Sequence, residues 1–261
     1  MAGHPSGLLI ISGDEHGQVR FWKVHKQRKW IKPIKVSNWP ATRQKWSTVQ
    51  CLTVSARGTF VAAGGSSDSE KTRGMICLYH IQNQDDIDID KPMVFRSGDN
   101  SNLFAFAGIT ALCFTVNEMY LLACDLAGTI VCNVIVFSRQ RGERKSDEFD
   151  LVKVIKSGVN SRINGICTHD QDKYVFCSNG SESYILACQF EQLIDTIEPV
   201  VFQRCLRANG DEDKTTGVLS TKHGLFLISK RLQLYQVITN SNGSRKEIIL
   251  QIDRKTRLPN R

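Results

Sequence analysis

The sequence repeats one pattern, in which two short apolar runs are joined by a polar turn, as in a β-hairpin. The first copy spans residues 8–24, where Gly17 provides the positive φ angle that a tight hairpin turn commonly needs. Further copies lie at residues 59–81, 119–137, 174–190 and 225–238. Because no segment of helical periodicity separates these hairpins, the sequence predicts an all-β protein.

Additional apolar runs accompany the hairpins. Two strand-like runs precede each hairpin after the first. The nearer runs lie at residues 49–54, 109–116, 163–168 and 217–220, and the runs before them lie at 31–36, 93–96, 151–155 and 200–206. The repeating unit is therefore four strands. Tandem four-stranded antiparallel units predict a β-propeller, because its radial closure shelters most sheet edges. A β-sandwich is the rival fold, and the regular four-strand unit argues against it.

We expect a single β-propeller over residues 1–261. Its predicted parts are a partial blade at residues 8–24, blades at about 31–81, 93–138, 151–190 and 198–238, and a tail strand at 247–252. Because the chain then opens on the third strand of a unit, the ring is expected to be incomplete or part of a larger ring. If the tail strand joined the first hairpin, a five-bladed ring with one incomplete blade would result.

The first hairpin resembles the closing hairpin of the WD40 family. Residues 13–22, GDEHGQVRFW, follow that family's G-x-x-D-G-x-V-x-x-W pattern, with His16 where Asp is commoner. Residues 109–118 resemble its inner strand and turn. The family's Gly-His pair and Trp-Asp ending are absent from every unit. The resemblance implies a WD40-like propeller whose rim loops contact partners.

A second resemblance concerns the order of features along the chain. Residues 49–54, the extended hairpin at 64–81 and residues 182–185 are similar to the N-terminal propeller of the class C vacuolar sorting subunits of the HOPS and CORVET tethering complexes. This resemblance implies a divergent, truncated copy, without the helical solenoid and RING domain that follow there. It also implies a role in endosome and vacuole fusion.

Chemical motifs point away from catalysis. The nine cysteines include no C-x-x-C pair and lie mostly in apolar runs, as buried free thiols do, which favours a reducing compartment. His169, Asp170 and Asp172 form the nearest acid–base cluster, but we expect them to cap the turn in which they lie. The sequence therefore predicts no catalytic, cofactor or metal site, no small-molecule substrate and no enzyme.

The net charge of +8 is unevenly distributed, because residues 17–67 contain no Asp or Glu. This stretch supplies a candidate basic and aromatic interaction surface: Lys23, Lys26, Arg28, Lys29, Trp30, Lys32, Lys35, Trp39, Arg43, Lys45 and Trp46. An acidic loop with Asp85, Asp86, Asp88 and Asp90 is a candidate docking site for a basic partner. It does not resemble a calcium loop, because isoleucines interrupt it and no glycine follows.

We therefore expect a non-enzymatic scaffold that binds other protein subunits of a larger assembly, with membrane tethering as the role that the resemblance implies. The alternative is an RNA- or DNA-binding propeller that uses the basic, tryptophan-rich residues 20–46. An anionic membrane surface is a further candidate ligand of this segment. Because no apolar run is long enough to span a membrane, we expect an intracellular protein that is cytoplasmic or peripheral on endomembranes, with a nuclear location left open.

Overall fold

The computed structural model describes residues 1–25, 30–38, 48–66, 73–82, 87–97, 107–126, 133–139, 149–156, 162–179, 184–195, 203–207, 215–221, 224–229, 234–239 and 245–248. Within these residues the chain forms strands and one short helix, α1 (Phe190–Asp195). The predicted all-β class is confirmed. Among the described segments, none is a helix long and apolar enough to cross a membrane.

The strands form five separate four-stranded antiparallel sheets, which follow one another along the chain. Sheet 1 contains β1 (Ala2–Gly3), β2 (Leu9–Gly13), β3 (Gln18–His25) and β4 (Trp30–Asn38). Sheet 2 contains β5 (Thr48–Val54), β6 (Phe60–Ser66), β7 (Gly74–Ile81) and β8 (Ile87–Arg96), and sheet 3 contains β9 (Ile109–Phe114), β10 (Tyr120–Asp125), β11 (Asn133–Arg139) and β12 (Phe149–Lys156). Sheet 4 contains β13 (Ile163–His169), β14 (Tyr174–Asn179), β15 (Tyr184–Gln189) and β16 (Gln203–Arg207), and sheet 5 contains β17 (Thr215–Thr221), β18 (Gly224–Ser229), β19 (Leu234–Thr239) and β20 (Arg245–Ile248).

The sheets do not follow the predicted unit boundaries. The prediction joined β4 to the second hairpin, whereas β4 pairs with β3, with Val24 opposite Ile31. Residues 247 and 248 of the predicted tail strand 247–252 lie in β20, which pairs with β19 and completes sheet 5, and residues 249–252 lie outside the described residues. The first hairpin is therefore the middle of a complete four-stranded sheet that begins with β1, rather than a partial blade. Its tight turn is as predicted, because Gly17 has a φ of 72°.

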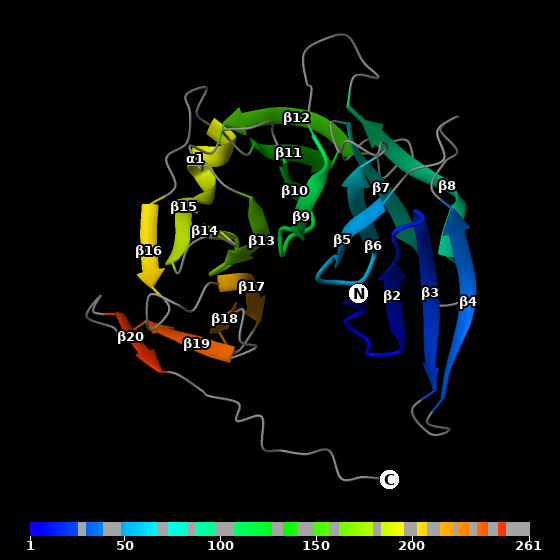
Figure 1. Ribbon diagram of the computed structural model, residues 1–261, viewed down its shortest axis with the longest axis horizontal. Helices are drawn as coiled ribbons and strands as arrows, with labels where there is room; N and C mark the ends of the chain where they lie inside the picture. Colours follow the sequence, from blue (N-terminus) through cyan, green and yellow to red (C-terminus); the bar gives the residue numbers. More distant parts are fainter. Residues whose placement is uncertain are drawn as a thin grey trace.

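Figure 1 shows the five sheets side by side in an arc around a common centre, with the first strand of each sheet innermost and the fourth outermost. Consecutive sheets meet mainly through these inner strands: β5 contacts β9, β9 contacts β13, and β13 contacts β17. Sheet 1 joins the series through contacts of β1, β2 and β3 with β5. Sheets 1 and 5 are the two ends of the arc.

An apolar layer lies between each pair of consecutive sheets. Leu9, Ile11, Val19 and Phe21 of sheet 1 pack in one cluster with residues of sheet 2, and the rings of Phe21 and Tyr79 meet edge to face with centroids 5.5 Å apart. Further clusters join sheets 2 and 3, sheets 3 and 4, and sheets 4 and 5. The middle strands β6, β10 and β14 of sheets 2, 3 and 4 are thus buried on both faces, which explains why they are continuous apolar runs in the sequence.

Candidate interaction surface

The turns that open sheets 1, 2 and 3 share one hydrogen-bond pattern. The backbone N–H of His4 donates to the carbonyl of Leu9 (2.9 Å), that of Ser55 to Phe60 (2.9 Å) and that of Thr115 to Tyr120 (3.0 Å). The third residue after each donor has a positive φ: Gly7 at 67°, Gly58 at 80° and Glu118 at 57°. These turns are therefore equivalent positions of one repeated structure.

Two buried carboxylates use these turns to join consecutive sheets. Glu118 of sheet 3 accepts the backbone N–H of Arg57 in sheet 2 at 2.8 Å. Asp172 of sheet 4 accepts the backbone N–H groups of Val116 (2.8 Å) and Asn117 (3.3 Å) in sheet 3. We call these two contacts the carboxylate clasps. Both oxygens of Asp172 and the Oε1 of Glu118 accept hydrogen bonds within the protein, as the burial of a carboxylate requires.

The predicted acid–base cluster belongs to this system. The hydroxyl of Thr168 donates to Asp172 at 2.6 Å, and the Nδ1 of His169 lies 2.9 Å from the hydroxyl of Ser220 in sheet 5. We expected these side chains to cap their own turn, but Asp172 caps the turn of the preceding sheet. The cluster therefore links sheets 3, 4 and 5.

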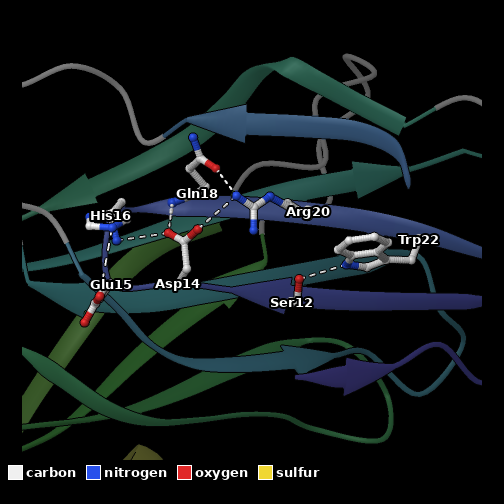
Figure 2. A network of polar contacts seen from close by, with 7 residues as sticks. All are labelled: Ser12, Asp14, Glu15, His16, Gln18, Arg20 and Trp22. Atoms are coloured by element: carbon white, nitrogen blue, oxygen red, sulfur yellow. Dashed lines mark hydrogen bonds and ion pairs between the residues drawn. The ribbon is translucent and has the colours of Figure 1, made fainter. Parts of the chain in front are cut away.

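Asp14 organises the turn between β2 and β3, as Figure 2 shows. Its Oδ1 accepts the backbone N–H groups of His16 (3.0 Å) and Gln18 (2.9 Å), and its Oδ2 lies 3.3 Å from a guanidinium nitrogen of Arg20. Its backbone carbonyl accepts the N–H of Val49 in sheet 2 at 3.0 Å. One residue thus fixes the hairpin turn, the Arg20 side chain and the position of β5.

Arg20 and Trp22 lie on the face of sheet 1 that turns away from sheet 2. Along β3 they alternate with Val19 and Phe21, which are fully buried against sheet 2. In register, Arg20 lies opposite Ser12 and Trp22 lies opposite Ile10. The indole Nε1–H of Trp22 donates to the Ser12 hydroxyl at 2.8 Å, and Arg20 also donates to the Gln18 side chain (Figure 2). We call Ile10, Ser12, Arg20 and Trp22 the Trp22 face.

In sheets 2 and 3, the side chains at the positions equivalent to the Trp22 face are buried against the preceding sheet. Register pairs Val61 with Tyr79 and Ala63 with Cys77 in sheet 2, and Leu121 with Phe137 and Ala123 with Ile135 in sheet 3. All eight side chains are 0% exposed, and those of sheet 2 pack against sheet 1 while those of sheet 3 pack against sheet 2. By contrast, Ile10 and Trp22 are half-buried, and the Arg20 side chain is 38% exposed. Within the described residues, no other sheet packs on the Trp22 face.

The structure describes only part of the predicted basic surface. Lys23 lies opposite Lys32, and Lys35 lies opposite Phe21. Lys32 is exposed, Lys23 and Lys35 are partly buried, and Trp30 begins β4. The remaining members lie outside the described residues: Lys26, Arg28, Lys29, Trp39, Arg43, Lys45 and Trp46. Of the predicted set, the structure therefore brings together Lys23 and Lys32 across the β3–β4 pair.

The predicted acidic loop is partly a strand. Asp88 and Asp90 lie at the start of β8, where Asp88 is opposite His80 of β7. The alternating Ile-Asp-Ile-Asp pattern of residues 87–90 explains this, because alternation is the period of a strand. Asp85 and Asp86 lie outside the described residues. Since β8 contacts β4, the acidic strand runs beside the basic one.

The cysteines whose side chains are described are free thiols, five buried and two partly buried. Burial raises the pKa of Cys77, Cys113 and Cys188 to about 12, which keeps these thiols protonated. In the described part of the chain, no three His, Cys, Asp or Glu side chains are placed to hold a metal ion.

No protein-family model matches the sequence, and no curated protein is significantly similar to it. The Trp22 face was missed as a site in the sequence. The signal that could have found it is the polar pair Ser12 and Arg20, at hairpin positions that are small or apolar in the second and third hairpins.

Proposed function

We propose that this protein is a non-enzymatic β-propeller scaffold of the WD40 type, which binds other protein subunits of a larger assembly. The radial series of four-stranded sheets, with the first strand of each at the centre, supports the propeller fold. The observation that carries the scaffold function is the Trp22 face. Trp and Arg are the residue types that contribute most to protein–protein binding, and here hydrogen bonds hold both on a partly exposed sheet face.

The framework behind that face is suited to binding without rearrangement. Apolar layers join every pair of consecutive sheets, and the carboxylate clasps fix sheet 3 to its neighbours. A side chain that is already held in place loses little conformational entropy when a partner docks. The resemblance to class C vacuolar sorting subunits favours a tethering assembly on endosomal or vacuolar membranes, with the protein peripheral on them.

Native purification tests this proposal. The protein, tagged at its chromosomal locus, would be purified under native conditions and its mass measured by light scattering after size-exclusion chromatography. We expect a complex of fixed stoichiometry that is heavier than the single chain. A monomer at its cellular concentration, with no stoichiometric partner, would contradict the scaffold function.

Binding of RNA or DNA through residues 20–46 stays a prediction, because five cations of that segment, Lys26, Arg28, Lys29, Arg43 and Lys45, lie outside the described residues. We expect only weak, non-specific binding of single-stranded RNA. A nanomolar affinity at physiological salt that is lost on replacing Lys26, Arg28 and Lys29 would instead favour nucleic acid as the ligand.

A further inference from the structure

We draw no further inference here: the strongest candidate, the partly exposed Trp22 face of sheet 1, belongs to the site already described, and nothing in the structure shows what covers it.

Discussion

The carboxylate of Asp172 in sheet 4 accepts the backbone N–H of Val116 in sheet 3 at 2.8 Å. Among the described strands, none pairs with a strand of another sheet, so each interface depends on apolar packing and on such bridging contacts. Glu118 repeats the arrangement one sheet earlier, where it accepts the backbone N–H of Arg57. The carboxylate clasps thus fix the distance between the opening turns of consecutive sheets. We expect their loss to weaken the contacts between those sheets.

Asp172→Ala tests the clasp between sheets 3 and 4. The change leaves two backbone N–H groups and the Thr168 hydroxyl without their acceptor, so we expect the free energy of unfolding to fall by about 1–3 kcal/mol in urea denaturation. The matched control is Asp170→Asn in the same turn, which keeps a residue that tolerates a positive φ. Because Asp170 is exposed, its replacement should change stability by less than about 0.5 kcal/mol. Equal losses in the two variants would contradict the clasp.

Gly58→Ala tests the turn between β5 and β6, which contacts His4 of sheet 1. Gly58 has a φ of 80°, and a Cβ at this position would lie 2.0 Å from the Nε2 of His4, which bonds the Gly58 carbonyl. We expect a loss of about 1–2 kcal/mol from the left-handed backbone alone. The control is Gly3→Ala, because nothing lies within 4 Å of a Cβ there. A thermal melt in which both variants match the wild type would contradict the left-handed conformation of Gly58.

Gly13→Ala probes the interface between sheets 1 and 2. A Cβ on Gly13 would lie 2.3 Å from a methyl carbon of Val49, next to the bond between Val49 and Asp14. Overpacking of this kind should cost about 1–3 kcal/mol. At Gly217 the nearest atoms lie 3.7 Å away, so Gly217→Ala is the matched control and should be close to neutral. Chemical denaturation of the two variants separates the outcomes, and a neutral Gly13→Ala would place β5 farther from β2 than described.

The buried thiols give stability a defined dependence on alkaline pH. Burial raises the pKa of Cys77, Cys113 and Cys188 from 9.0 to about 12, so the folded protein keeps protons that the unfolded chain releases near pH 9. Their contribution is therefore fully present below pH 9 and is lost as the pH rises toward 12. We expect the free energy of unfolding to fall in that window by up to about 1.4 kcal/mol per pH unit for each thiol.

Cys77→Ala isolates one of these thiols. It should lower stability at neutral pH modestly, but it should also reduce the slope of stability against pH between pH 9 and 12. Urea denaturation at several pH values measures that slope. An unchanged slope, or rapid alkylation of Cys77 in the folded protein at pH 8, would contradict its burial among apolar side chains.

The hairpins could be predicted from the sequence because strands buried on both faces are nearly continuous apolar runs. The grouping of strands into sheets could not, since β4 follows one hairpin and precedes another and its pattern fits either. The segment between β3 and β4 is shorter than that between β4 and β5, which favours pairing within sheet 1. In sheet 3 the segment between β11 and β12 is longer than that between β12 and β13, although β12 pairs with β11. The length of the connecting segments therefore does not by itself predict which sheet a strand joins.

The site was harder to predict than the fold. The charge pattern predicts an interaction surface along the long basic stretch, and of its lysines the structure describes Lys23, Lys32 and Lys35. The Trp22 face depends instead on register, because Ser12 and Arg20 become significant only when they are seen opposite each other. The role of Asp172 was likewise hidden, since its acceptor bonds reach a turn more than fifty residues earlier in the chain.

Hydrogen–deuterium exchange of the protein, free and within its purified native assembly, tests most directly whether it is a scaffold that binds through the Trp22 face. We expect peptides that cover β2 and β3 to exchange more slowly in the assembly. The turns at Ser55 and Thr115, which open sheets 2 and 3, should exchange at the same rate in both samples. Identical exchange of β2 and β3 in the free and the assembled protein would contradict binding at this face.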